Sequence, residues 1–178
     1  MSFVISNKQH LAPTEERVQY DPKVFVDEGI VIEKYDVAFG HPLYTSAIDM
    51  FLMRLDDNCE KGQHVPIVPD GCMAMVFKGN LYNDEPAEGF LCGATDEIKK
   101  VYVDREDYYV FMRFVPGTGY SLIKNEKNAG IIYDTAISIK GGVEGAEQIC
   151  SVLERDIPRT ERAGLISKVI RVNLQKEP

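Results

Sequence analysis

Apolar and polar residues alternate along much of the middle of the chain. A period of two places alternate side chains on opposite faces of a β-strand. The pattern predicts short strands at 30–32, 64–68, 73–77, 89–93, 98–103 and 108–115, separated by turns rich in glycine and proline. Segment 44–55 is ambiguous, because its apolar residues also fit the spacing of a helix. Many short strands joined by turns are typical of a β-sandwich or a β-barrel.

The pattern changes after Gly141-Gly142. Apolar residues then recur at positions 146, 149, 150 and 153, which is the spacing of an amphipathic helix. Pro158 ends this helix, and a second helix is predicted from about Arg159 to Gln175. The second helix carries two apolar stripes, Leu165/Val169/Val172 and Ile166/Ile170/Leu174.

One of the two stripes can pack on the rest of the same chain. The other has no obvious local partner, and a leftover apolar stripe usually marks an interface. We therefore expect a homodimer in which Leu165, Val169 and Val172 contact a second copy. The alternative, in which both stripes are buried within one monomer, stays open.

These patterns divide the 178 residues into three parts. We expect a polar N-terminal arm over 1–19, a β domain over 20–139 and a pair of helices over 140–178. This length accommodates one domain with a substantial core and a helical appendage.

Charge and composition exclude several functions. The formal charge is −8 and the pI about 4.9, whereas binding to DNA depends largely on clustered positive charge, so we expect no DNA binding by these residues. No window reaches the roughly 18 apolar residues of a membrane span, and the start lacks the features of a signal peptide, so we expect a cytoplasmic protein with no membrane partner. The four cysteines form no CxxC pair, and we expect reduced thiols.

Two segments combine an apolar strand with a tight turn. In 68–77 the turn comes first, where Pro69 fixes φ, Gly71 tolerates a positive φ and Asp70 lies between them. In 110–117 the strand comes first and Pro116-Gly117 ends it.

Together these segments, Val68-Pro69-Asp70-Gly71-Cys72-Met73 and Met112-Arg113-Phe114-Val115-Pro116-Gly117, resemble the N-terminal domain of AraC-type transcriptional regulators. The resemblance implies a cupin-like β-barrel or jelly roll followed by two helices, and it favours a strand over 44–55. It implies a domain that senses an unidentified small-molecule effector and dimerises through a helix beside the barrel. In that family DNA is bound by separate C-terminal helix-turn-helix units, which are missing from this sequence.

Arg113 is the single residue for which the sequence makes the most specific functional prediction. Alternation along its strand places Arg113 on the face opposite Val110, Met112 and Phe114, so Arg113 lies outside if those residues face the barrel interior. We favour an arginine paired with a neighbouring carboxylate over one that recognises a ligand. Many similar sequences carry an acid where this chain has Ala74, which leaves Asp70 as the alternative partner.

A methionine-rich apolar set is the candidate wall of an effector pocket. Methionine adapts to varied ligands, and ligand pockets are mostly apolar, but the same residues also suit an ordinary core. The set consists of Met73, Met75, Phe77, Met112 and Phe114.

No pattern for catalysis or metal binding accompanies these features. His10, His41 and His64 are scattered and form no HxH pair, and no GxSxG or phosphate-loop motif occurs. We therefore expect no enzymatic activity, no metal and no cofactor. Two alternatives stay open: a small cupin-type enzyme, and a stand-alone small-molecule-binding module.

Overall fold

In the computed structural model, which describes residues 29–37, 40–67, 69–82, 86–124 and 132–175, β-strands are followed by helices. The larger antiparallel sheet has six strands in the order β1 (Ile30–Tyr35), β2 (Ala47–Leu55), β7 (Asp107–Phe114), β4 (Ala74–Asn80), β5 (Pro86–Cys92) and β8 (Ala136–Ser138). The smaller sheet pairs β3 (Gln63–Ile67) with β6 (Lys99–Val103).

The helices follow the strands in sequence. A 3₁₀ turn, η2 (Gly119–Leu122), comes after β7, and α1 (Ile139–Gly142) comes after β8. The two predicted helices are α2 (Ala146–Leu153) and α3 (Arg159–Leu174). Pro158 directly precedes α3, in keeping with its inability to continue α2.

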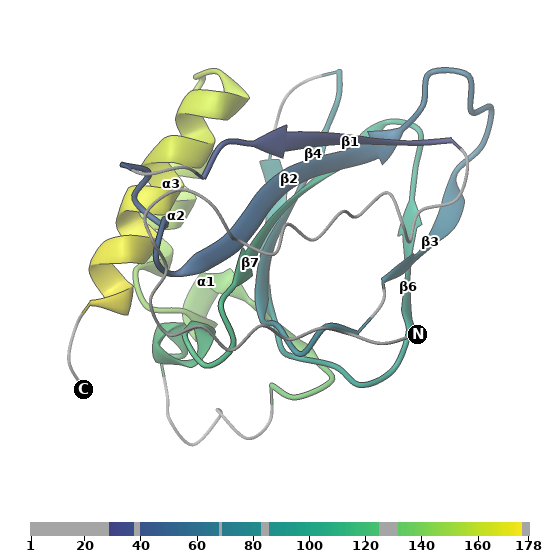
Figure 1. Ribbon diagram of the computed structural model, residues 1–178. Coiled ribbons are helices and arrows are strands. Elements are labelled where there is room, and N and C mark those ends of the chain that lie inside the picture. The colour runs from purple at the N-terminus through teal and green to yellow at the C-terminus, as the bar shows by residue number, and fades with distance from the viewer. Residues whose placement is uncertain (1–28, 38–39, 68, 83–85, 125–131, 176–178) are drawn as a thin grey trace.

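The larger sheet is covered on both faces. Figure 1 shows α2 and α3 on one side of this sheet and β3 and β6 on the other. The helix-facing core joins Met75 and Met112 of the sheet to Ile166 and Ile170 of α3. A second core lies between the two sheets, among side chains of β2, β3, β4, β6 and β7. Because successive side chains of a strand point to opposite faces, the larger sheet contributes residues to two separate cores.

The prediction of a mainly β chain with C-terminal helices is confirmed, and 47–55 is a strand. Among the described residues, however, the hydrogen-bonded pairs do not close the strands into a barrel, because β3 and β6 pair only with each other. The expected arm over 1–19 and the first residues of the expected β domain lie outside the described residues.

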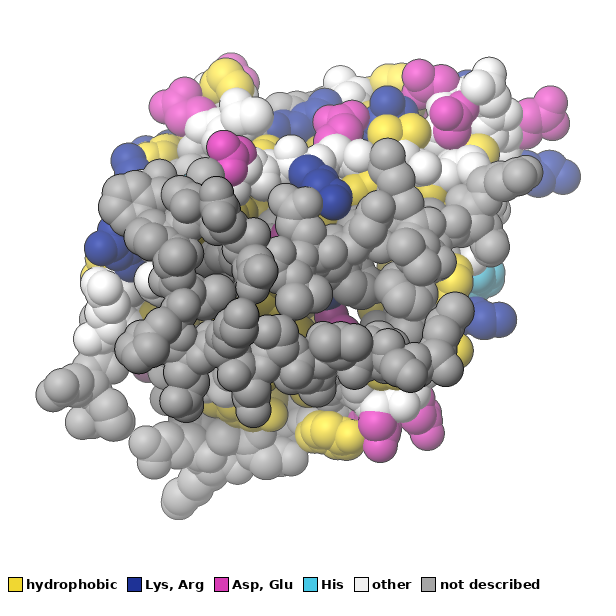
Figure 2. All heavy atoms as spheres, in the orientation of Figure 1, with side chains coloured by type: hydrophobic (Ala, Val, Ile, Leu, Met, Phe, Trp, Pro, Cys, Tyr) yellow, Lys and Arg dark blue, Asp and Glu magenta, His cyan; other side chains and the backbone are white. Residues whose placement is uncertain are grey.

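Charged side chains of both signs are mixed on the face shown in Figure 2, with lysines and arginines interspersed among acidic residues along the edge occupied by β1. Within the described part of the chain, no helix is both long and apolar enough to cross a membrane.

Gly93 offers a sharp test of the packing next to β5. A Cβ atom at Gly93 would collide with the backbone carbonyl of Ile132, which cannot move as a flexible side chain can. We expect Gly93→Ala to lower the free energy of unfolding by about 2 to 3 kcal/mol in urea titrations followed by circular dichroism.

Gly164 in α3 is the matched control, because a Cβ there meets no atom within 4 Å. Gly164→Ala should leave stability unchanged or raise it by up to about 1 kcal/mol, since alanine is the better helix former. Equal losses in the two variants would contradict this packing.

Candidate functional site

The turn that precedes β4 is built around Asp70. Gly71 adopts a φ of +70°, a conformation that favours glycine. The backbone amide of Cys72 donates a hydrogen bond of 2.9 Å to Oδ1 of Asp70. One carboxylate oxygen of Asp70 thus closes the turn, and the other is available to a second partner.

The end of β7 lies against this turn. The amide of Phe114 donates to the carbonyl of Met73 at 2.8 Å, and the amide of Val115 donates to the carbonyl of Ser46 at 2.9 Å. Beyond Pro116, Gly117 has a φ of +88° in the turn that follows β7. The two segments that carry the AraC-type resemblance therefore meet in space.

Arg113 joins three segments of the chain. Its Nε donates to Oδ1 of Asp49 at 2.8 Å and its Nη2 to Oδ2 of Asp49 at 2.6 Å, a bidentate pair. Its Nη1 donates to Oδ2 of Asp70. The side chain of Arg113 is only 7% exposed, against 15% for Asp49 and 27% for Asp70. We call Asp49, Arg113 and Asp70 the ion triad.

The electrostatics of the ion triad keep the arginine charged. Burial lowers the pKa of Arg113, but the hydrogen bonds and negative charge of Asp49, together with those of Asp70, raise it above its ordinary value. The guanidinium has three of its donors engaged by carboxylates. This arrangement fixes the relative positions of β2, β7 and the turn before β4.

Register places Asp49 and Arg113 in one row across the larger sheet, while Asp70 lies in the turn before β4. Asp49 lies opposite Arg113, Arg113 opposite Ala74, and Ala74 opposite Cys92. In the next row Phe51 and Phe111 stack with ring centroids 5.0 Å apart. Both phenylalanines belong to the core between the two sheets, so the triad lies on the face that looks toward β3 and β6.

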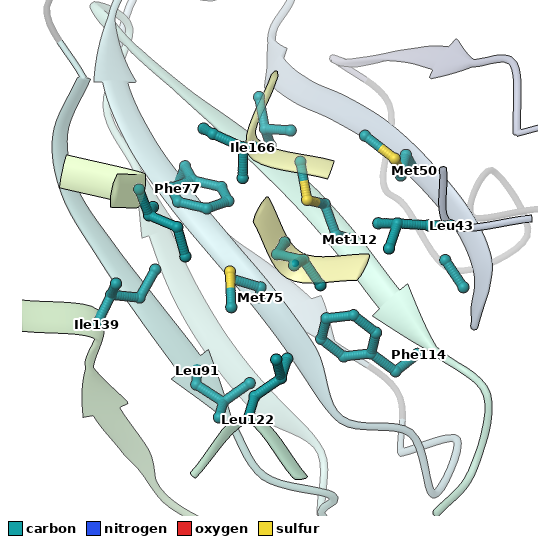
Figure 3. Packing of buried hydrophobic residues seen from close by; sticks show 14 of the residues in the cluster. Leu43, Met50, Met75, Phe77, Leu91, Met112, Phe114, Leu122, Ile139 and Ile166 are labelled. Carbon is teal, nitrogen blue, oxygen red and sulfur yellow. The ribbon is translucent and has the colours of Figure 1, made fainter. Parts of the chain in front are cut away.

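The predicted pocket set lies on the other face. All five residues are buried in the helix-facing core: Met73, Met75, Phe77, Met112 and Phe114. Figure 3 shows Met112, Phe77 and Ile166 gathered in this core. The space between Phe77, Met112 and the α2–α3 helices has a volume of only about 20 Å³.

The condition on which we placed Arg113 outside, a barrel interior lined by Val110, Met112 and Phe114, is not met. Met112 and Phe114 pack toward the helices, and Arg113 points into the space between the sheets rather than outside. The reason is that α2 and α3 cover the face that carries Val110, Met112 and Phe114. Whether the methionine-rich set admits a ligand stays a prediction.

The predicted dimer stripe is divided between core and surface. Leu165 and Val169 are half-buried and pack against the helix-facing core. Val172 is 59% exposed. Of the three residues, Val172 offers the clearest surface for a second copy.

The two histidines within the described residues, His41 and His64, make separate contacts. The ring of His64 lies edge-on to Tyr102 at 5.2 Å, Nδ1 of His41 accepts a hydrogen bond from the amide of Leu43, and His10 lies outside the described residues. In the described ranges no group of three or more His, Cys, Asp or Glu side chains has a metal-binding arrangement.

Sequence reasoning missed Asp49. Its strand alternation with Phe51 and Met53 would have placed it on the face of Arg113, but the helical alternative for 44–55 hid that alternation. Asp70, which we had named as the alternative partner, does contact Arg113.

Removal of Arg113 should be costly. Arg113→Gln leaves two neighbouring, largely buried carboxylates without their cation, and we expect the free energy of unfolding to fall by about 3 kcal/mol. Lys78→Gln is the control, because Lys78 also pairs with an acid, Asp107 at 2.8 Å, but is 36% exposed. That loss should stay below about 1 kcal/mol. Similar losses in both variants would show that the triad contributes no more than a surface pair.

Two thiols report on the surroundings of the triad. Burial, followed by the charge of Asp70, raises the pKa of Cys72 to about 12, and burial raises the pKa of Cys92 to about 11. Because a raised pKa leaves little thiolate at pH 8, both residues should react with iodoacetamide at least about tenfold more slowly than in the urea-unfolded chain. Mass spectrometry of peptides resolves each site. Equal rates in folded and unfolded protein would place these thiols in water.

Comparison with known families gives one match. The family described as Domain of unknown function (DUF6597) matches residues 42–137, a stretch that contains both the PDGC turn and the whole of β7. No curated protein and no solved structure matches the chain. Because the matched stretch spans more than half of the sequence, the chain belongs to the DUF6597 family.

Proposed function

We propose that this chain is the effector-sensing and dimerisation domain of an AraC-type transcriptional regulator and performs no catalysis of its own. The observation that carries the proposal is the meeting of the two segments that resemble such regulators. Asp70 of the first segment pairs with Arg113 of the second, and Met73 accepts a hydrogen bond from Phe114. The two segments that carry the resemblance therefore contact each other in the fold. Such a contact is expected if the chain shares the fold of these regulators.

The order of elements supports the same proposal. A cupin-like β domain followed by helices is the arrangement that the resemblance implies, and here α2 and α3 follow the strands and pack on the larger sheet. Ile166 and Ile170 of α3 are buried against that sheet, whereas Val172 is exposed. A second copy of α3 would cover Val172 and its half-buried neighbour Leu165.

Dimerisation has a clear role in such a regulator. Two-fold pairing of the sensor domains would bring two DNA-binding units to neighbouring half-sites. The formal charge of −8 argues that DNA contact is made by separate helix-turn-helix units and not by these residues.

A fusion assay tests the proposal. Residues 1–178 are placed before a DNA-binding domain that represses a reporter gene only as a dimer. We expect repression by the fusion and its loss in Val172→Glu, because a charge at this position opposes burial in the dimer. Light scattering at tens of micromolar should show a dimer for the wild-type chain and a monomer for the variant.

Thr160→Glu is the matched control. It adds the same charge at an exposed position in the first turn of α3, where the helix dipole favours an acid. This variant should repress as well as the wild type. A fusion that fails to repress although it is folded and abundant, or a wild-type monomer at tens of micromolar, would refute the dimerisation role.

A further inference from the structure

One side of α3 faces away from the larger sheet. The helix runs along one flank of the molecule in Figure 1, and Ala163, Ile166 and Ile170 are buried where it packs on the sheet. On its other side four residues follow one another at intervals of four, three and four, which places them in one continuous row because an α-helix has 3.6 residues per turn. We call this the outer row, and its members are Glu161, Leu165, Lys168 and Val172.

The outer row alternates charged and apolar side chains. Glu161, Lys168 and Val172 are exposed, and Leu165 is half-buried. Glu161 lies in the first turn of α3 and Lys168 in its second half. They are separated by two turns, about 10 Å along the axis, and are therefore too far apart to pair within one helix. The acid and the base of the row thus point to solvent at two different heights of the same face.

A two-fold axis brings these charges together between two copies. Most homodimers are related by such an axis, which pairs a surface with itself. If the axis is perpendicular to α3 and crosses it midway between Glu161 and Lys168, the two helices run antiparallel. Each Glu161 then lies beside Lys168 of the second copy, and the ion pair forms twice.

The same axis also covers the apolar members of the outer row. Leu165 lies next to the axis, so the two copies of this side chain contact each other. Val172 of one copy falls beside the turn that precedes α3 in the other, where Ile157 is half-buried. One axis therefore provides apolar contacts for both Leu165 and Val172 and an opposite charge for both charged residues.

A parallel pair of helices does not have this complementarity. With the axis along α3, Glu161 of one copy faces Glu161 of the other, and Lys168 faces Lys168. Like charges at such positions repel each other. The order of charges along the outer row therefore favours the antiparallel arrangement.

We propose that two copies of α3 pack antiparallel about a two-fold axis, and that Glu161 of each copy forms an ion pair with Lys168 of the other. This inference rests on the proposed function, because it names the geometry and the polar contacts of the dimerisation helix. It makes Glu161 and Lys168 the residues that set the orientation of the two domains in the dimer.

Charge reversal tests the pairing in the full chain. Glu161→Lys and Lys168→Glu each place like charges in both symmetric contacts. Each should raise the dimer dissociation constant about tenfold at low salt, because an attraction becomes a repulsion at two places. Sedimentation equilibrium over a range of concentrations measures the constant. Lys168→Glu keeps the test decisive even if Glu161→Lys weakens the first turn of the helix, where an acid is favoured.

The double variant Glu161→Lys/Lys168→Glu rebuilds both ion pairs with their signs exchanged. It should dimerise nearly as tightly as the wild type, although both single variants are weaker. A parallel dimer gives a different result, because each single reversal replaces one pair of like charges by another and leaves the dissociation constant unchanged.

Lys100→Glu is the control variant. It makes the same change of charge as Lys168→Glu at an exposed position of β6, which lies on the opposite side of the larger sheet from α3. This variant should dimerise as the wild type does.

The outcomes separate this inference from the proposed function. A wild-type dimer whose single reversals bind equally well, or whose double variant is as weak as the single ones, overturns the antiparallel ion pairs and leaves the dimerisation role in place. A wild-type chain that is monomeric at tens of micromolar overturns both.

Discussion

Strand β7 lies between β2 and β4, and neither of its faces meets solvent. All five residues from Val110 to Phe114 are buried. Because successive side chains of a strand point to opposite faces, β7 needs one cover for Val110, Met112 and Phe114 and a second for Phe111 and Arg113. The helices supply the first cover and the β3–β6 sheet lies over the second. The layered arrangement of the molecule follows from this requirement.

Arg113 makes the requirement more stringent, because a buried cation is tolerated only with partners. The larger sheet meets this need through an irregularity in β2, whose register against β7 shifts between Ala47 and Asp49. The extra residue, Ile48, brings Asp49 opposite Arg113, which is a typical use of a β-bulge to re-aim a side chain. The PDGC turn supplies Asp70 as the second partner. The β2 bulge and the turn before β4 thus each supply one carboxylate partner of the buried Arg113.

The sequence predicted six of the eight described strands and both main helices, because these segments have a clear hydrophobic period; it left β2 ambiguous and did not predict the three-residue β8. It did not predict which elements pack on each face of β7. A period of two shows which residues share a face, but not which helix or strand packs against that face. Asp49 was missed because apolar residues in 44–55 also fit a helix. In α3, helical periodicity alone could not separate Val169 from Val172. Val169 packs beside Gly145 and the helix-facing core, whereas Val172, three residues later, is 59% exposed.

The attachment of α3 to the larger sheet differs along its length. In its middle, α3 lies on the sheet through apolar contacts of Ile166 and Ile170, which are non-directional. At its first turn the guanidinium of Arg159 instead lies 4.7 Å from the ring centre of Tyr108. Val172 follows 13 residues later on the same continuous helix, roughly 20 Å away at the rise of an α-helix. The apolar contacts in the middle of α3 therefore hold the helix on the sheet, while Val172 near its C-terminal end stays exposed.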